Sequence, residues 1–357
     1  MAVSDRVRTR ARERLEALGQ SGLGTEEARR EAIAVLRPAV GFERWCWPLT
    51  DPGSALSTSG IADFDLWPEL PRIAVLEEHG DITSKPRLVL GSRASMTLSA
   101  ATGGDLARST RWRECLQPYG VGDELMTACR DRHGCWGSLE LMRDSGDPPF
   151  AVDDAQFLHR VSPALASLIR IGLRETWRAP YPQRPPLPPA TLIVGAELRP
   201  KSWTPAFRDW LDELPTGGGP ETLPPAVYEL VTRVLTPTDA ANGLPASVRT
   251  RTRTGQWATI EGAPLEGDDR RHAAIIVRSA TIDEVFDLFA KTYDLTRRER
   301  ELAALILSGL TTKQLAATLC ISHHTVQDHL KAVFAKSGLR SRRELIAHLA
   351  GASVCQF

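Results

Sequence analysis

The sequence predicts an α+β body followed by an all-α C-terminal unit. Signals for helix starts and ends recur four times over residues 294–357, whereas strand-like and helix-like segments alternate in the residues before them. The body is divided by residues 179–190, where prolines fix φ, remove N–H donors and so favour an extended linker. We therefore expect two mixed α/β domains, a linker between them and a helical domain at the C-terminus.

The first domain is expected over residues 1–178 and begins with a helix. Four residues share one side of that helix: Val7, Ala11, Leu15 and Leu18. This side can contact a second subunit in a dimer or pack inside one subunit, and the sequence leaves both open. Near the end of the domain, an alternating strand over residues 133–143 precedes Phe150 and a long helix from about Asp153. Four apolar residues follow one face of that helix: Phe157, Val161, Leu165 and Leu168.

The order of these last elements, a strand, a polar turn, an aromatic residue and a long amphipathic helix, resembles the closing part of a GAF domain. The resemblance covers roughly residues 20–176. It implies a mixed sheet flanked by helices, a fold that commonly binds small molecules or dimerises. A small-molecule effector of this GAF-like domain is therefore expected, and the residues that bind it stay unassigned.

Aromatic, histidine and cysteine side chains in this domain allow a second interpretation as a ligand site. Five tryptophans can wall a pocket: Trp45, Trp47, Trp67, Trp112 and Trp136. Aromatic side chains of a small sheet domain are mostly core, which favours packing. His79, His133 and Cys135 lack a second ligand at metal spacing, so we predict no metal and no cofactor. Cys129 and Cys135 can pair as a redox switch, but nothing in the sequence predicts a lowered thiol pKa.

The composition is that of a soluble globular chain, with 42% hydrophobic and 25% charged residues. No stretch approaches the roughly 18 consecutive apolar residues of a membrane span, and the Arg-rich N-terminus has no apolar signal core. Six cysteines without paired short spacing favour reduced thiols over a disulfide framework or zinc site. We expect a cytoplasmic protein without a membrane partner. The linker over 179–190 can also be a ligand for an aromatic groove, although a spacer is favoured.

The second domain is expected over residues 191–280. A strand over 191–195 precedes a helix over 224–235 and three strand-like runs, an order and size that resemble a PAS domain. Arg249, Arg251 and Arg253 alternate along the first of those runs, so they share one face of the sheet. They can contact DNA or an acidic ligand, yet a solvated sheet face is favoured.

A helix over residues 281–293 directly precedes the C-terminal domain, which is expected over residues 294–357. Its apolar residues form one surface: Ile282, Val285, Phe286 and Phe289. This surface can dock on a sensor domain or a second subunit and so reorient the C-terminal helices. Packing within one subunit explains it equally well.

The C-terminal helices start where capping residues stand. Thr296 with Glu299, Thr311 with Gln314 and Ser341 with Glu344 have the spacing of reciprocal capping boxes. Ser322 is a plain N-cap before the third helix. Gly309 and Gly338 end the first and third helices, because glycine readily adopts the left-handed closing conformation.

The second and third helices are joined by only Cys320, Ile321 and Ser322, a turn typical of helix-turn-helix units. One face of the third helix is apolar: Val326, Leu330, Val333 and Phe334. The opposite face is polar or small: His324, Gln327, Asp328, Lys331 and Ala335. A helix of this width fits the major groove, where base edges present distinct donor and acceptor patterns.

Residues 295–299, 309–316 and 321–330 resemble the LuxR-type helix-turn-helix of bacterial transcription regulators. The resemblance implies that DNA-binding residues lie at the starts of the second and third helices: Thr311, Thr312, Lys313, Ser322, His324, Thr325, Gln327, Asp328, His329 and Lys331. Thr311, Thr312, Lys313, Thr325 and His329 would touch phosphates. The family usually has Lys or Arg where Gln327 stands, which implies modest affinity. A helical dimerisation cap explains the apolar stripes but not the match of the exposed positions.

Charge is divided along the chain. From Asp294 onward there are nine Lys and Arg against five Asp and Glu, a net charge of +4, and the remaining residues carry 35 against 39, a net charge of −4. The sequence thus predicts a dimeric transcription regulator with double-stranded DNA and RNA polymerase as partners. A dimer would bind half-sites ~34 Å apart. One alternative is a protein-interaction regulator whose helix-turn-helix no longer binds DNA. The other is an enzyme, for which no motif is present and which only a pocket with strongly perturbed acids would favour.

Overall fold

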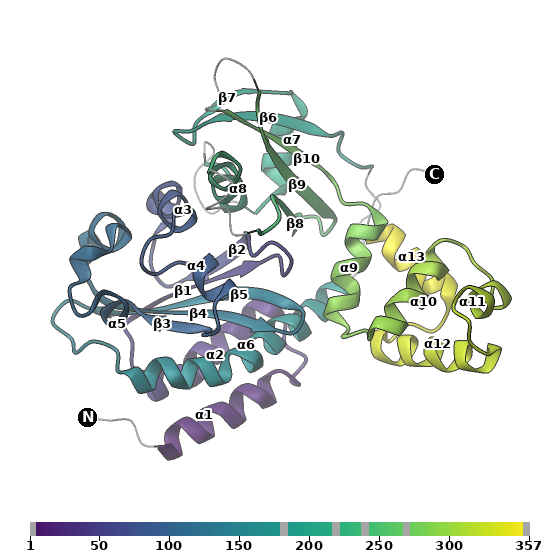
Figure 1. Ribbon diagram of the computed structural model, residues 1–357, viewed down its shortest axis with the longest axis horizontal. Coiled ribbons are helices and arrows are strands. Elements are labelled where there is room, and N and C mark those ends of the chain that lie inside the picture. Colours follow the sequence, from purple (N-terminus) through teal and green to yellow (C-terminus); the bar gives the residue numbers. More distant parts are fainter. Residues whose placement is uncertain (1–4, 179–184, 216–221, 237–242, 267–271, 353–357) are drawn as a thin grey trace.

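The computed structural model describes residues 5–178, 185–215, 222–236, 243–266 and 272–352. We call residues 5–178 the first unit, residues 185–279 the second unit and residues 294–352 the C-terminal unit. Figure 1 shows the first two stacked on each other and the C-terminal unit beside them. Of the predicted linker, residues 179–184 lie outside the described residues, and residues 185–189 form neither helix nor strand.

A five-stranded antiparallel sheet forms the centre of the first unit. Its strands run in the order β2 (Ser57–Ala62), β1 (Arg44–Thr50), β5 (Gly134–Asp144), β4 (Val121–Asp131) and β3 (Ser95–Thr97). The strand predicted over residues 133–143 is therefore confirmed as β5. It pairs along most of its length with β4, and both are largely buried because helices cover both faces of the sheet.

One face of this sheet is covered by α6 (Val152–Arg178) and α2 (Thr25–Val40), which pack against each other, and α1 (Asp5–Leu18) lies below them in Figure 1. All four apolar residues predicted along α6 are buried. Ala11 and Leu15 of α1 are buried in the same core, so this side of α1 packs within the chain. On the other side of the sheet in Figure 1 lie α3 (Leu70–Glu78) and α4 (Lys85–Leu90), and α5 (Leu98–Thr102) directly follows the edge strand β3. Short 3₁₀ and π turns complete the unit: Trp67–Glu69, Leu106–Arg108, Trp112–Leu116 and Gln117–Tyr119.

The second unit repeats the strand topology of the first. Its sheet runs in the order β7 (Pro200–Trp203), β6 (Ala190–Gly195), β10 (His272–Ser279), β9 (Trp257–Pro264) and β8 (Ser247–Arg251). Counted along the described strands of each unit, both sheets have the order second, first, fifth, fourth, third. Helices α7 (Ala206–Glu213) and α8 (Pro225–Leu235) belong to this unit. The predicted strands and the helix over 224–235 are confirmed.

Helix α8 joins the two units. It packs against α3 and β2 of the first unit. Arg233 of α8 forms a bidentate ion pair with Glu78, with nitrogen–oxygen distances of 2.6 and 3.2 Å. Glu229 of α8 lies 2.7 Å from the Lys85 ammonium. Because these side chains are buried or nearly so, the contact between the units depends on charge pairing as well as on apolar packing.

The prediction of a solvated arginine face on the second unit is wrong for Arg249. Its guanidinium donates to both carboxylate oxygens of Asp51, at 2.7 and 2.8 Å, and to Asp287 at 2.7 Å. Arg253 lies beyond the end of β8 and is exposed. Alternation along a strand fixes the side on which a residue lies, but it does not reveal which neighbouring element covers that side.

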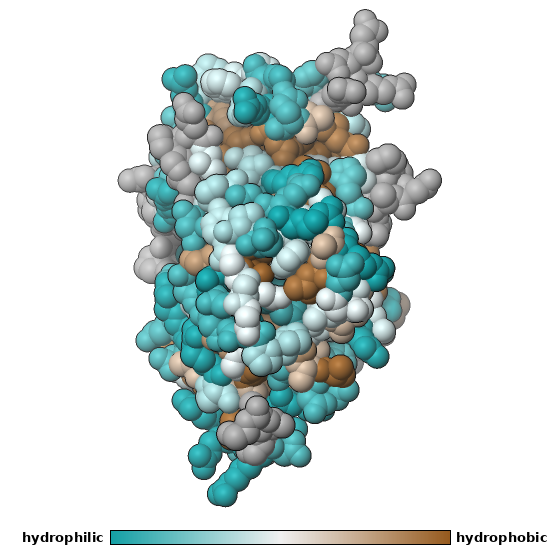
Figure 2. Space-filling view, turned by 90° about the vertical axis from the view of Figure 1, so that its left-hand side faces the viewer, coloured by the Kyte–Doolittle hydropathy of each residue, from teal (hydrophilic) through white to brown (hydrophobic). Residues whose placement is uncertain are grey.

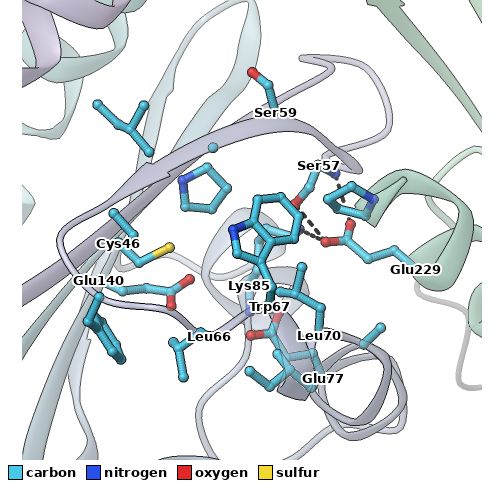
Figure 3. A pocket seen from close by; sticks show the side chains of 18 residues that line it. Cys46, Ser57, Ser59, Leu66, Trp67, Leu70, Glu77, Lys85, Glu140 and Glu229 are labelled. Atoms are coloured by element: carbon cyan, nitrogen blue, oxygen red, sulfur yellow. Dashed lines mark hydrogen bonds and ion pairs between the residues drawn. The ribbon is translucent and has the colours of Figure 1, made fainter. Parts of the chain in front are cut away.

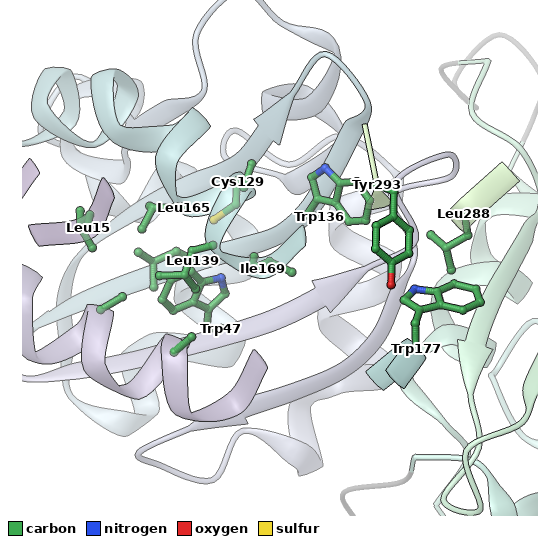
Figure 4. Packing of buried hydrophobic residues seen from close by; sticks show 14 of the residues in the cluster. Leu15, Trp47, Cys129, Trp136, Leu139, Leu165, Ile169, Trp177, Leu288 and Tyr293 are labelled. Atoms are coloured by element: carbon green, nitrogen blue, oxygen red, sulfur yellow. The ribbon is translucent and has the colours of Figure 1, made fainter. Parts of the chain in front are cut away.

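The core of the first unit continues into the C-terminal unit through α9 (Ile282–Thr292), as Figure 4 shows from Leu15 to Trp177 and Leu288. Trp177, at the end of α6, stacks on Trp257 with ring centroids 5.4 Å apart. Its ring also meets Phe289 edge-on at 5.5 Å. The predicted coupling helix therefore packs within this chain, with Val285, Phe286 and Phe289 buried.

The predicted packing of the tryptophans holds in part. Trp45, Trp47 and Trp136 are buried in the core, whereas Trp67 and Trp112 are half-buried. The thiols of Cys115, Cys129 and Cys135 are buried and unpaired, and burial raises the pKa of Cys129 well above its usual value. Cys129 therefore has no character of a reactive thiol. Cys355 lies outside the described residues.

Hydrophilic side chains cover most of the face seen in Figure 2, and the largest hydrophobic area lies in its upper part, at the height of the second unit. Among the helices that the structure describes, none is long and apolar enough to cross a membrane.

Candidate nucleic-acid interface

Four helices form the C-terminal unit, in agreement with the prediction: α10 (Arg297–Leu307), α11 (Thr312–Thr318), α12 (His323–Ser337) and α13 (Arg342–Ala352). The Thr296–Glu299 and Thr311–Gln314 capping boxes are both complete. Ser322 accepts a hydrogen bond from the Thr325 N–H at 3.0 Å and so caps α12. A cap of this kind stabilises a helix by about 1 kcal/mol, so the helix starts follow from the sequence itself.

The third predicted box is only half present. The Ser341 hydroxyl accepts from the Glu344 N–H at 3.1 Å, as expected. The Glu344 carboxylate, however, accepts from the N–H of Arg340 at 2.7 Å instead of the N–H of Ser341. The side chain reaches one residue further back, so the expected reciprocal bond is not formed.

The turn between α11 and α12 contains a residue in the left-handed conformation that is not glycine. Cys320 has φ of 51°, and its side chain is exposed. The glycines at the two predicted helix ends, Gly309 and Gly338, have φ of 81° and 74°. A side chain with a β-carbon is strained in this region, whereas glycine is not.

We therefore expect Cys320→Gly to raise the free energy of unfolding by about 0.5–1 kcal/mol, which is the strain relieved minus the added entropy of the unfolded chain. Urea unfolding of the full-length protein measures this change. Cys320→Ala is the matched control, because it removes the thiol but keeps the β-carbon and should give no gain. A glycine variant less stable than the alanine variant would contradict the expectation.

Helix α12 separates its two faces as predicted. Val326, Leu330 and Val333 are buried against α10 and α11, and Phe334 is partly buried in the same cluster. His324, Asp328, Lys331 and Ala335 are exposed on the other face, and Gln327 is half-buried. The helix is thus held by one stripe while its polar side chains remain accessible to a groove.

All ten predicted DNA-binding residues lie on α11, on α12 or at their caps. Six of them are exposed: Thr311, Lys313, Ser322, His324, Asp328 and Lys331. Four are half-buried: Thr312, Thr325, Gln327 and His329. The structure brings them onto two helices that pack against each other.

Several of these side chains already have partners within the chain. The Ser322 and Thr325 hydroxyls lie 2.9 Å apart, and Thr311 donates to Gln314 at 2.8 Å. The Arg342 guanidinium donates to the Thr312 hydroxyl at 2.9 Å. These bonds orient the hydroxyl groups, so part of their role is to shape the helix starts.

Only some of the basic side chains of the C-terminal unit form ion pairs or other contacts within the fold. Arg298 bonds the backbone carbonyl of Leu319, and Lys336 pairs with Glu299 at 2.6 Å, so both hold the fold together. Five Lys and Arg residues of the unit form no ion pair among the residues described: Lys313, Lys331, Arg340, Arg342 and Arg343. Arg340 and Arg343 are exposed and were not predicted as site residues, although their basic side chains in the sequence provided the signal.

The C-terminal unit is also fixed to the first unit by charge. Asp294, at the junction of α9 and α10, accepts from His133 at 2.6 Å and from the more exposed Arg132. Burial alone would raise the pKa of Asp294, but the hydrogen bonds from Arg132 and His133 lower it overall. His133 therefore serves as a partner of Asp294.

Comparison with known proteins finds a family match within the C-terminal unit. The family described as "Bacterial regulatory proteins, luxR family" matches residues 294–349. Over 51 residues the chain is 51% identical to an HTH-type transcriptional regulator in the exeN 3′ region of Aeromonas salmonicida, which is 14% of this chain and 26% of that protein. It is 38% identical over 55 residues to spore germination protein GerE of Bacillus subtilis, covering 15% of this chain and 74% of that protein. The chain thus spans about a quarter of the Aeromonas regulator.

Among solved structures, Escherichia coli SdiA aligns over 96% of both chains with 12% sequence identity and a TM-score of 0.34. This score is too low to support a conclusion about the first two units.

Proposed function

The chain belongs to the luxR family of bacterial regulatory proteins, and we propose that it is a sequence-specific, DNA-binding transcription regulator. One observation carries the proposal: α12 buries its apolar stripe and exposes a polar face that includes Gln327 and Lys331. Gln can pair with both adenine N6 and N7 at a base edge, whereas Lys attracts phosphates. Together they provide base reading and backbone attraction on one helix.

We further propose that the first and second units are sensor modules, GAF-like and PAS-like, that set the activity of the C-terminal unit. The sheets of the two units have the same strand order, which supports the proposal that both units are modules of the same kind. The continuous core through α9 supports transmission between modules and C-terminal unit. A homodimer with half-sites ~34 Å apart, a small-molecule effector and contact with RNA polymerase belong to the same proposal.

The proposal assigns no catalytic activity to the chain. The nearest arrangement to a nucleophile and base is Ser57 with Lys85, whose ammonium donates to the Ser57 hydroxyl at 2.8 Å. Burial lowers the pKa of Lys85, but the Glu229 and Glu77 carboxylates raise it overall. A lysine that stays protonated cannot take a proton from serine, so these residues support an ion-pair role.

Two substitutions on α12 test the proposal by selection of bound sequences from a random duplex pool over a salt series. We expect Lys331→Ala to weaken binding to all sequences and to reduce the salt slope by about one. Gln327→Ala should instead change the preferred base at one position, at a cost of about 1–3 kcal/mol for the preferred site. Arg160→Ala on α6 removes an exposed cation far from α12 and is the matched control.

Other outcomes decide against parts of the proposal. Equal loss on every sequence for both variants would contradict base reading by Gln327. Absence of salt-sensitive duplex binding by the full-length protein would favour the protein-interaction alternative, to which Gln327 and Asp328 already point.

A further inference from the structure

A cavity of about 110 Å³ lies where the first and second units meet. Its walls come from β1, β2, β5, α3 and α4 of the first unit and from α8 of the second. An engineered, closed protein cavity of ~150 Å³ accommodates benzene, so this smaller cavity has room for a short chain or for part of a ring, the rest of which can lie at its open side.

One wall of the cavity is apolar and contains an aromatic ring. In Figure 3 the Trp67 indole lies in the middle of the view, between Glu140 on one side and Glu229 on the other, with Leu66 and Leu70 below it. Trp67 is half-buried, in contrast to the fully packed tryptophans of the core. Its ring therefore offers a surface for a ligand.

Carboxylates outnumber cations around this cavity. Four glutamates belong to the buried cluster, against two basic residues: Glu77, Glu124, Glu140 and Glu229 against Lys85 and Arg111. Lys85 pairs with Glu229 at 2.7 Å, and Arg111 pairs with Glu124. Arg111 also lies 3.9 Å from Glu77. Both cations therefore form ion pairs, and these pairs involve three of the four glutamates: Glu229, Glu124 and Glu77.

Glu140 is the acid without a cation. Among the described residues, no Lys, Arg or His nitrogen lies within 4.0 Å of its carboxylate. Its carboxylate accepts a hydrogen bond from the Ser138 hydroxyl at 3.3 Å. Burial, with the neighbouring Glu124 and Glu77, raises the pKa of Glu140 to about 8. Cys46, which also faces the cavity, stays a neutral thiol because burial raises its pKa.

We propose that the cavity binds a small organic cation, an amine whose ammonium group pairs with Glu140 and whose apolar part lies against Trp67 and Leu70. A carboxylate opposite an aromatic ring is an arrangement that attracts ammonium groups, through ion pairing and cation–π interaction. The inference deepens the proposed function, since it rests on the first unit being a sensor module.

The arrangement favours an organic cation over a metal ion. No group of three His, Cys, Asp or Glu side chains within the described ranges is placed to hold a metal. The wall formed by Trp67, Leu66 and Leu70 would also be left without a role by a bare ion. An amine uses both the acid and the apolar surface.

Contacts lead from this cavity to α9, so binding of a ligand can affect the C-terminal unit. Glu229 of α8 accepts from the Ser57 N–H and hydroxyl at 2.9 and 2.6 Å, so the second unit forms one side of the cavity. Beyond the cavity, Asp51 at the end of β1 pairs with Arg249 of β8, which also pairs with Asp287 of α9. A ligand that moves α8 therefore acts on the helix that leads into the C-terminal unit.

Calorimetric titration of the full-length protein with benzylamine tests the inference, with benzyl alcohol as the neutral analogue and benzoate as the anionic one. Benzylammonium should bind at least about tenfold more tightly than benzyl alcohol, and benzoate should not bind. Near pH 7 Glu140 carries a proton in the empty cavity, so binding of the cation should release close to one proton. Titrations in buffers of different ionisation enthalpy measure this release.

Glu140→Gln should abolish both the preference for the cation and the proton release, while Glu27→Gln, an exposed acid on α2, should change neither. Trp67→Leu should weaken benzylammonium binding more than benzyl alcohol binding. Equal affinity for the cation and the alcohol, or an unchanged preference in Glu140→Gln, would overturn the inference. Duplex binding is measured on the same samples. DNA binding without amine binding overturns this inference alone, whereas amine binding without DNA binding supports it and counts against the proposed function.

Discussion

Arg233→Met is expected to lower the free energy of unfolding by about 3–5 kcal/mol, because it leaves the Glu78 carboxylate buried without its cation. The two side chains are 2% and 5% exposed. Arg233 also donates to the backbone carbonyls of Ser54 and Pro245, at 2.8 and 3.1 Å. Methionine keeps the length of the side chain but supplies no donor, so three acceptors lose their partner together.

Urea unfolding followed by tryptophan fluorescence measures this loss. Arg297→Met is the matched control, because Arg297 pairs with Glu301 while 94% exposed, and it should change stability by less than about 0.5 kcal/mol. The double variant Glu78→Gln with Arg233→Met should recover part of the loss, since no charge is then left buried. A loss no larger than that of the control would contradict a stabilising role for the pair.

The elements that the sequence predicted well are those whose signals are local. The caps at Thr296, Thr311 and Ser322 act within three residues of themselves, and all three are found in the structure. The same spacing in Thr281 and Glu284 forms a complete box at the start of α9, which could have been recognised from the sequence. Local hydrogen bonds of this kind can be predicted from the sequence because both partners lie on one turn of the chain.

Contacts between distant segments could not be predicted in this way. Arg249 was assigned to a solvated face, yet Asp51 lies 198 residues away along the chain and covers it. The cavity at Trp67 depends on α8 of the second unit reaching over β2, and no spacing in the sequence encodes that approach. Tertiary packing decides these positions, whereas the ten predicted DNA-binding residues lie close together because they belong to two consecutive helices.

Trp177→Ala is the second substitution for which we expect a large effect, a loss of about 3–5 kcal/mol. Trp177 is 1% exposed and meets rings from three other elements. Its partners are Trp257 of β9, Phe289 of α9 and His348 of α13, with ring centroids 5.4, 5.5 and 5.9 Å away. Truncation to alanine would open a cavity where the three units meet.

Because that ring connects the C-terminal unit to both others, we expect the loss to be concentrated at this junction. Amide hydrogen exchange should speed up in α9 and α13 more than in β4 and β5, which belong to the same core but supply none of the three rings that meet Trp177. Trp203→Ala is the control, since Trp203 is 46% exposed and its removal should cost less than about 0.5 kcal/mol. Trp177→Phe should retain much of the stability, because the indole N–H has no hydrogen-bond partner among the described residues and only the aromatic surface is needed. Uniform acceleration across the sheet strands would instead mean that Trp177 supports the whole fold and not this junction.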